Sequence, residues 1–265
     1  INSYEEVIET SFNRFLHPFL NIFLSKNDMD TINKSEAVIH FGNFGFKTKN
    51  KSFTLIQNLL PLKLNNPKNL ILMYFIEKSF KKSDHIIYQL DHVAGEIKNK
   101  FKSKLIKIGV VEKFTNNINS ETGLICINSK IKNKNFNFME AVLEEVEIEM
   151  PELKITNFYS EEKQKIEGGN STSLLDSFSK HSIYFHTSFY ETVGLPLYEA
   201  SSAGLLVVAP GYVYMDHFDT SNSIKYTPND IESATRSIKK AVNFQNNTIE
   251  SLKYTEDWGL VLKSI

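Results

Sequence analysis

The chain has 265 residues, 41% of them hydrophobic and 23% charged, which is the balance of a globular protein with one large or two modest domains. Its single cysteine, Cys126, excludes a disulfide within one chain and favours a reducing compartment. Because no apolar run reaches the length of a membrane-spanning helix, we expect a cytoplasmic protein.

The formal charge of −1 is unevenly distributed along the chain. Residues 1–120 hold 17 basic and 11 acidic groups, whereas residues 121–265 hold 13 and 20. An uneven split can arise by chance, but it also fits two domains with different partners. A basic first half suits anionic lipid or a phosphorylated acceptor. The near-zero total charge argues against nucleic-acid binding.

Helices and strands alternate in the first half, which predicts a parallel α/β sheet. We expect a helix at 4–24 that Pro18 kinks or breaks. The elements predicted after it are strands at 37–43, 52–58, 85–90 and 104–111, with helices at 67–82 and 92–101. Residues 70–82 combine a large apolar surface with lysines. They predict either peripheral contact with an anionic membrane or a core-packing helix with a basic end.

The polar stretch 114–122 lacks periodicity and is predicted to link two domains. Strand and helix patterns then alternate again. The predicted strands are 123–128, 152–158, 182–188 and 205–210, and the predicted helices are 136–149, 172–180, 196–203 and 230–243. The resulting organisation is a first domain at 1–115, a second at 116–245, and a C-terminal helix at 246–265 that packs back toward the first domain.

Two glutamates flank a Gly-Leu-Pro turn directly after the buried strand at 182–188. Free backbone amides at Val193, Gly194 and Leu195 would open a helix and favour an anion. Glu191 precedes this turn and Glu199 lies one turn into the helix. A sugar nucleotide would bind here with its phosphates at the backbone amides and its sugar hydroxyls at the two acids. The alternative is an ordinary helix start with dipole-favoured acids.

The whole stretch resembles the signature of retaining GT-B glycosyltransferases of the large family four, which reads roughly S-x-x-E-G-F-G-L-P-x-x-E-A-x-A-x-G-x-P-V-V-A. The matching positions are Ser188, Glu191, Gly194, Leu195, Pro196, Glu199, Ala200, Gly204, Val207, Val208 and Ala209. The departures are Thr192-Val193, Ser202 and Leu206. The resemblance implies two Rossmann-like domains facing a cleft, with a first domain that is short or truncated.

The resemblance also implies roles for individual residues. Glu191 would contact the hydroxyls of the transferred sugar and stabilise the positive charge that builds on it. The amides at Val193 to Leu195 would meet the sugar and the diphosphate, and Glu199 would hold the ribose. Thr192 replaces a glycine close to the donor sugar, so sugar selectivity or activity is expected to differ.

The family neutralises its diphosphate leaving group with an Arg and a Lys. Lys134-Asn135 stands where the family has Lys-Gly, but Asn128-Ser129 occupies the Gly-Arg slot. Lys130 or Lys132 would have to substitute for the arginine, without its bidentate geometry. The alternative for these two lysines is a solvated basic loop.

No metal or other cofactor is expected. Asp28-Met29-Asp30 imitates a metal-binding D-x-D motif, but it follows an amphipathic helix, so we interpret it as a helix cap or loop. His181 and His186 lack zinc-ligand spacing, and His186 is predicted to be a satisfied core histidine.

The first domain carries weaker signals on the side expected to face the acceptor. A glycine-bearing loop and the end of the next strand supply, by similarity, Gly42, Asn43, Asn58 and His40. The helix at residue 4 appears where the family has a strand and a glycine-rich loop, so the start of this domain is expected to be missing or reduced.

The predicted function is transfer of a hexose-type sugar from a nucleotide diphosphate sugar to a glycan or lipid-linked acceptor, with retention. Lysine supplies 28 of the 30 basic residues, and Asn and Ile are abundant, which points to an AT-rich bacterial genome. Together with this composition, the resemblance implies a role in bacterial surface-polysaccharide synthesis. A non-catalytic GT-B-like scaffold is the main alternative. A GT-B epimerase is a third possibility, although no acid-base set for it is identifiable.

Overall fold

The computed structural model describes residues 25–63, 67–118, 123–129, 131–159, 172–218, 221–244 and 248–265. The predicted helix at 4–24 and the candidate Lys130 lie outside these residues. The chain divides into two compact units, which we call the first unit (Ile1–Gly109 with Glu256–Ile265) and the second unit (Val110–Thr255). Each contains a parallel sheet, so the predicted α/β fold is confirmed.

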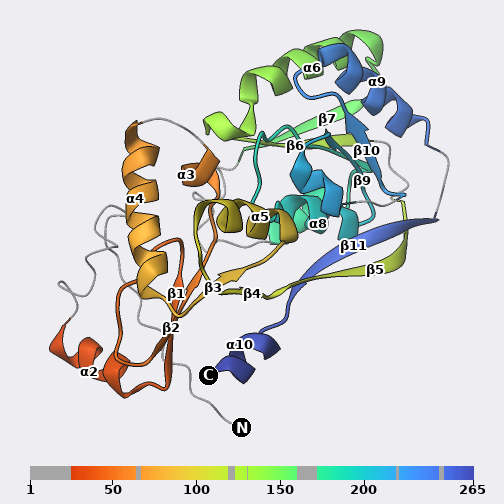
Figure 1. Cartoon of the computed structure of the whole chain (residues 1–265). Coiled ribbons are helices and arrows are strands. Elements are labelled where there is room, and N and C mark those ends of the chain that lie inside the picture. The colour runs from red at the N-terminus through yellow and green to blue at the C-terminus, as the bar shows by residue number, and fades with distance from the viewer. Residues whose placement is uncertain are drawn as a thin grey trace. The chain divides into compact units, whose positions relative to one another are not determined.

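The sheet of the first unit has the order β1-β2-β3-β4, with parallel pairing throughout (Figure 1). Its strands are β1 (Ala37–Phe41), β2 (Lys51–Leu55), β3 (His85–Tyr88) and β4 (Leu105–Lys107). Its helices are α2 (Lys26–Lys34), α3 (Leu60–Lys63), α4 (Pro67–Lys82), α5 (Asp91–Lys100) and α10 (Gly259–Ser264).

The C-terminal end of the chain completes the core of the first unit. Phe53 and Leu55 lie on one face of β2 and pack with Val261 of α10. Thr54 points to the other face, where its hydroxyl hydrogen-bonds Ser83. The final helix is shorter than the one expected over 246–265, because residues 248–256 form a strand instead. Thr248, Ile249 and Thr255 are β-branched, which favours this extended conformation.

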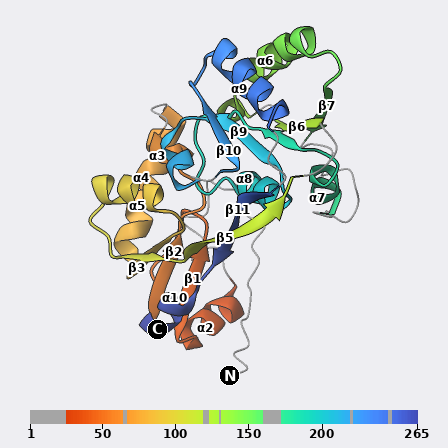
Figure 2. The same cartoon turned by 90° about the vertical axis from the view of Figure 1, so that its right-hand side faces the viewer.

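The sheet of the second unit has the order β10-β9-β8-β6-β7 and is also parallel. Figure 2 shows α6 and α9 together over one face of this sheet and α8 on the other. The strands are β6 (Gly123–Asn128), β7 (Lys154–Tyr159), β8 (Ile183–Phe185), β9 (Leu206–Pro210) and β10 (Ser223–Tyr226). The helices are η2 (Lys132–Lys134), α6 (Phe136–Glu149), α7 (Thr172–Phe178), α8 (Leu195–Ser202), η4 (Val213–His217) and α9 (Ile231–Val242).

The strand order reverses between β6 and β8. The chain leaves β6 through α6 to reach β7 on one side, and β8, β9 and β10 then follow on the other side. Connections therefore diverge at the carboxyl ends of β6 and β8. In open parallel sheets this switch point is where ligands bind. The topology selects the loops after β6 and β8 as the place to look for a site.

A two-stranded ribbon of β5 (Gly109–Asn117) and β11 (Thr248–Glu256) completes the described elements. We expected 114–122 to be an unstructured linker, but the strand continues through Asn117. Pattern analysis did not identify this end of the strand because its side chains are polar. In addition, its partner strand lies more than a hundred residues away, so no local pattern indicates the pairing. The strand β10 was likewise not anticipated.

Candidate functional site

The carboxyl end of β8 leads directly into the predicted motif. The strand is fully buried, and the chain continues through His186, Thr187 and Ser188, which are also buried. Glu191 follows in the loop, and α8 begins at Leu195. Because β8 is held between β6 and β9, its end is a rigid base for the loop that carries Glu191.

An ion pair joins the two residues predicted to be catalytic. The Nζ atom of Lys134 donates a hydrogen bond to Oε1 of Glu191 at 2.6 Å. The side chains are 29% and 13% exposed, so the pair is largely sheltered from solvent. Lys134 ends the short helix after β6, and Glu191 follows β8. The two groups thus meet at the switch point of the sheet.

Asn133 joins the two loops through hydrogen bonds, a role that sequence analysis did not predict. Its side-chain amide donates to the carbonyl of Tyr190 at 2.7 Å, and its Oδ1 accepts from the Tyr190 amide at 3.1 Å. The Asn133 carbonyl accepts from the Phe189 amide at 2.9 Å. Thr187 adds a bond from its hydroxyl to the Lys134 carbonyl at 2.7 Å. These bonds fix the backbone on both sides of the Lys134–Glu191 pair.

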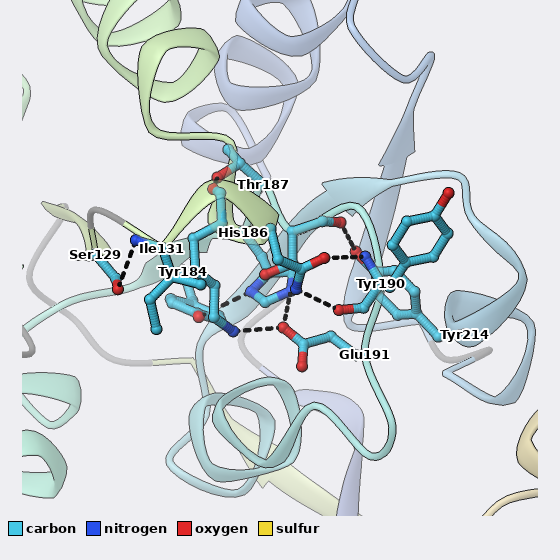
Figure 3. A network of polar contacts seen from close by, with 11 residues as sticks. Ser129, Ile131, Tyr184, His186, Thr187, Tyr190, Glu191 and Tyr214 are labelled. Carbon is cyan, nitrogen blue, oxygen red and sulfur yellow. Dashed lines mark hydrogen bonds and ion pairs between the residues drawn. The ribbon is translucent and has the colours of Figure 1, made fainter. Parts of the chain in front are cut away.

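His186 is buried, as expected of a core histidine, but only its Nδ1 has a hydrogen-bond partner among the described residues, and its ring lies against this site. Its ring is buried at 4% exposure, and Nδ1 lies 3.0 Å from the Tyr184 hydroxyl. Its Nε2 lies 3.4 Å from Oε1 of Glu191, which is longer than a good hydrogen bond. Figure 3 shows Tyr184, His186 and Glu191 converging. Tyr184 and His186 alternate along an otherwise apolar strand, and this spacing was the signal that sequence reasoning missed.

The charge states follow from burial and these contacts. Burial alone would raise the pKa of Glu191, but the nearby His186 and Lys134 outweigh it and lower that pKa from 4.5 to about 2. Burial lowers the pKa of His186 below 6.5 and opposes the pull of Glu191. Burial also raises the pKa of the Tyr184 and Tyr214 hydroxyls well above 10. At neutral pH the site therefore holds a carboxylate, an ammonium and neutral rings.

A small hollow lies against this cluster. It is partly open to solvent. It is lined by Ile127, Lys134, Tyr184, Phe185, His186, Thr187, Ser188 and Pro196. The hollow combines one cation with neutral polar groups and apolar walls, which suits a polar ligand that carries negative charge.

The turn before α8 has the backbone geometry that the motif requires. Gly194 has a φ of +73°, in the left-handed region. A Cβ on Gly194 would also lie 2.9 Å from the Leu197 side chain. The amides of Val193, Gly194 and Leu195 make no hydrogen bond with any residue that the structure describes. They remain available to an anion at the start of the helix.

Thr192 takes the position of a family glycine without strain. Its φ is not positive, so this backbone does not demand glycine there. Asn135, in contrast, has a φ of +53° and stands where the family has the glycine of Lys-Gly. Asparagine tolerates this conformation better than most residues do. The Asn135 amide also donates to Oδ1 of Asn229 at 3.1 Å.

Glu199 lies on α8 as predicted and is half-buried. Its carboxylate makes no hydrogen bond or ion pair within the described part of the chain. Glu191 and Glu199 both contribute to the raised pKa of the Tyr184 hydroxyl, after burial as the main cause. The two acids of the motif therefore lie within electrostatic range of the same buried tyrosine.

At the two positions where the family has Gly-Arg, this chain has uncharged side chains. Asn128, at the end of β6, is buried, and the hydroxyl of Ser129 accepts from the Ile131 amide at 3.4 Å. Lys132 is exposed to solvent. Lys134 is therefore the cation that the described part of this loop places against Glu191.

The acceptor-side candidates all lie in the first unit. The Asn43 side chain braces the end of β2: its Oδ1 accepts from the Gln57 and Asn58 amides, each at 3.1 Å, and its amide donates to the Asn58 carbonyl. Gly42 has a φ of +111°. His40 packs edge-on against Phe46, and burial lowers its pKa to about 4. These contacts explain Asn43 and His40 structurally, and their acceptor role stays a prediction.

The acids and histidines considered as metal ligands lie in other environments. Within the described ranges, no group of three or more His, Cys, Asp or Glu side chains could hold a metal ion. Asp28 closes a capping box with Ser25 at the start of α2, as our cap interpretation expected. Both His181 nitrogens have hydrogen-bond partners, the Ser177 carbonyl at 2.6 Å and the Thr156 hydroxyl at 2.8 Å.

Comparisons with known proteins support the fold. No protein-family model matches the chain, and no curated protein shows significant sequence similarity to it. Among solved structures, a mutant of TarM from S. aureus has a TM-score of 0.57 at 19% identity, covering 74% of this chain and 44% of TarM. The pneumococcal O-GlcNAc transferase GtfA gives 0.54 at 15%, covering 85% and 52%. Sucrose-phosphate synthase from Thermosynechococcus elongatus gives 0.58 at 12%, covering 84% and 67%.

These similarities define the class of fold. The chain has the Rossmann-like GT-B fold of nucleotide-sugar glycosyltransferases. It spans about half the length of TarM and GtfA.

Proposed function

We propose that the chain is the donor-binding and catalytic part of a retaining glycosyltransferase that uses a nucleotide diphosphate sugar. One observation carries this proposal. The Glu191 carboxylate, the Lys134 ammonium and the free amides before α8 come together at the switch point of the second sheet. Sugar hydroxyls need an acceptor, and a diphosphate needs a cation and N–H donors.

The residues divide the chemistry between them. The bond from the anomeric carbon to the diphosphate breaks, and a new bond forms to an acceptor hydroxyl, whose proton passes to the departing phosphate oxygen. Lys134 and the amides at 193–195 neutralise the leaving group. Glu191 accepts hydrogen bonds from the transferred sugar and stabilises the positive charge on its ring, while Glu199 holds the ribose. The Lys134 ammonium group donates one hydrogen bond to Glu191 and has two further N–H donors, which can turn to the diphosphate.

We further propose that this chemistry needs no metal ion, because the protein itself supplies charge for the diphosphate. EDTA should leave the rate of transfer unchanged, and added Mg²⁺ or Mn²⁺ should not raise it by more than about twofold, a small part of the several kcal/mol that a catalytic cation supplies. A tenfold or larger loss in EDTA that Mn²⁺ restores would contradict this part of the proposal.

UDP-sugars are the first donors to test. The TarM structure contains UDP and α-GlcNAc-glycerol, and the GtfA structure contains UDP and GlcNAc. By analogy, we propose a glycan or lipid-linked acceptor, in keeping with the predicted role in bacterial surface polysaccharide. The proposed location is the cytoplasm, with peripheral attachment to the inner face of the plasma membrane.

The donor site is tested by melting temperature with UDP, GDP, ADP and CMP and their sugar conjugates. A ligand at 100 times its Kd stabilises the folded state by about 2.7 kcal/mol, a shift of a few degrees for a chain of this size. Glu199→Gln should weaken the shift, whereas Glu232→Gln, on an exposed helix face, should not. Product analysis by NMR would then show whether the anomeric configuration is retained. The absence of a shift with every nucleotide would refute the donor site.

A non-catalytic binding subunit is the second candidate, and the uncharged Asn128-Ser129 slot favours it. It predicts that a sugar nucleotide binds but is neither transferred nor hydrolysed. Isothermal titration combined with a phosphate-release assay separates the two functions. Turnover that Glu191→Gln abolishes would exclude the scaffold.

We also propose that α4 contacts an anionic membrane. Leu70, Ile71 and Tyr74 are 51%, 54% and 53% exposed, and Lys78 lies 5.2 Å from the centre of the Tyr74 ring. Apolar residues flanked by lysines suit the surface of anionic lipid. Among described residues, no helix is long and apolar enough to cross a bilayer.

The membrane proposal is tested by sedimentation with vesicles. Phosphatidylglycerol vesicles should bind the protein and phosphatidylcholine vesicles should not, and salt should weaken the binding. Leu70→Ser with Ile71→Ser should reduce binding at least tenfold, about the effect of losing two buried apolar side chains. Ile148→Ser, at a 76% exposed position on α6, is the control for loss of an exposed apolar side chain. Unchanged binding by the double variant, or association between copies of the chain without lipid, would refute it.

A further inference from the structure

Two side-chain nitrogen atoms lie next to the same oxygen of the Glu191 carboxylate, and the two side chains differ in how freely they can move. Lys134 approaches Oε1 at 2.6 Å from a short helix, on a long side chain that is 29% exposed. His186 approaches it at 3.4 Å with a side chain that is 4% exposed. His186 directly follows strand β8, and the Tyr226 hydroxyl donates to its carbonyl at 2.9 Å. The lysine side chain can therefore rotate away from the carboxylate, whereas the buried histidine ring is held in place by its surroundings.

We propose that His186 is a positioning residue for Glu191, which holds the carboxylate through its Nε2–H when Lys134 turns to the donor diphosphate. This inference rests on the proposed function, because it assigns Lys134 two successive partners. To stay oriented toward the sugar, the Glu191 carboxylate needs a hydrogen-bond donor that remains in place when Lys134 turns to the diphosphate.

The tautomer follows from the hydrogen-bond network. The Tyr184 hydroxyl lies 3.0 Å from Nδ1 and is fully buried, so it stays protonated and can donate to that nitrogen. A neutral ring that accepts at Nδ1 carries its proton on Nε2. The Nε2–H then faces Oε1 of Glu191 at 3.4 Å. The opposite tautomer would set a lone pair against the carboxylate, which is electrostatically unfavourable.

The surroundings keep the ring neutral and fixed. The charged groups that face it are Glu191 and Lys134, and the other titratable neighbours are the Tyr184, Tyr214 and Tyr226 hydroxyls. The Tyr214 ring meets the imidazole edge-on at a centroid distance of 6.0 Å. Within the described part of the chain, Nε2 has no hydrogen bond of normal geometry. The Nε2–H can therefore form a shorter hydrogen bond to the Glu191 carboxylate.

The tautomer is measured by ¹⁵N NMR of histidine-labelled protein, with His186→Gln identifying the resonances. We expect a neutral ring with the proton on Nε2 at pH 7. Lys134→Met imitates the departure of the ammonium group. It should preserve this tautomer and move the Nε2 proton downfield, because the carboxylate then has one partner fewer. A proton on Nδ1, an imidazolium at pH 7, or an unchanged Nε2 proton in Lys134→Met would overturn the proposal.

Kinetics with the preferred donor give the second test. His186→Leu removes the donor group at similar size and should lower kcat about tenfold to a hundredfold with little change in KM, as expected for a misplaced catalytic group. His186→Gln keeps an N–H at the same reach and should recover most of the loss. His181→Gln replaces a buried histidine outside the site and should leave kcat unchanged. Melting temperatures verify that each variant is folded.

The outcomes separate this inference from the proposed function. Full kcat in His186→Leu, or an equal loss in His186→Gln and His186→Leu, would overturn the positioning role while leaving the transferase intact. If the wild type consumes no sugar nucleotide, the proposed function fails. The NMR comparison of wild type with Lys134→Met then decides by itself whether His186 holds the carboxylate.

Discussion

Replacing Glu191 by Gln should destabilise the second unit, and the size of the effect can be worked from the pKa. A pKa lowered from 4.5 to about 2 means that the folded state favours the carboxylate. At about 1.4 kcal/mol for each pH unit, this corresponds to about 3 kcal/mol. The Glu191 side chain is only 13% exposed, so solvent screening removes little of it. We expect Glu191→Gln to lower the free energy of unfolding by about 1 to 2 kcal/mol at pH 7, less than that figure because His186, which contributes to the low pKa, is neutral there.

The pH dependence of this loss provides a sharper test than its size. A group with a lowered folded pKa contributes its full stability above its unfolded pKa of 4.5 and loses it as the pH falls toward about 2. In a His186→Gln background, Glu191→Gln should therefore cost less stability at pH 3 than at pH 7. With His186 present, the comparison also contains the loss that this histidine brings below pH 6.5, which is larger in Glu191→Gln because the carboxylate that raises the His186 pKa is gone.

Urea unfolding followed by far-UV circular dichroism measures both quantities. Trp258 belongs to the first unit, so its fluorescence gives a separate signal for that part of the chain. Glu232→Gln is the matched control, because Glu232 pairs with Arg236 on a helix face where the two side chains are 86% and 69% exposed. Such pairs contribute about 0.3–0.5 kcal/mol. Equal losses in the two variants, or a Glu191→Gln loss that does not change with pH in the His186→Gln background, would refute the reasoning.

Three further changes test the backbone around the site. Gly194→Ala should cost about 1–2 kcal/mol, because its φ is +73°, and should weaken nucleotide binding in the same titration. Asn135→Gly should be tolerated, whereas Asn135→Val should lower the melting temperature, since a β-branched residue is strained at a φ of +53°. Tyr214→Phe removes the 2.6 Å bond to the Ser188 carbonyl and should cost about 1–3 kcal/mol in urea unfolding. A Gly194→Ala protein that binds nucleotide normally, equal melting of the two Asn135 variants, or a Tyr214→Phe protein of wild-type stability would contradict the respective prediction.

The sequence predicted best those elements whose signals are local. Both α4 and α6 have the predicted bounds, because Pro67 marks one start and apolar residues at helical spacing mark the other helix. The strands β5 and β11 were misjudged for the opposite reason. Each is half-exposed, and each is stabilised by a partner far away in the sequence. No local pattern reports that pairing.

The candidate site divides in the same way. Glu191 and Lys134 could be chosen from spacing and resemblance, and the structure brings them together. Asn133 could not, because an asparagine in a polar loop looks like any solvated residue until the opposing loop is known. His186 could not be placed beside Glu191, because a histidine in an apolar strand is more often structural. Its partner Tyr184, two residues earlier, was the clue that both rings share one face.

The shared oxygen of Glu191 gives a physical reason for combining a mobile cation with a fixed neutral ring. An ammonium group that turns toward a diphosphate supports the carboxylate less, and a buried carboxylate without a second partner would then be poorly compensated. A second cation in place of His186 would remove that penalty but would compete for the charge that Glu191 must offer to the sugar. A neutral N–H supports the carboxylate without cancelling its charge. The buried, uncharged imidazole beside Glu191 meets this requirement, and a lysine or arginine at position 186 would not.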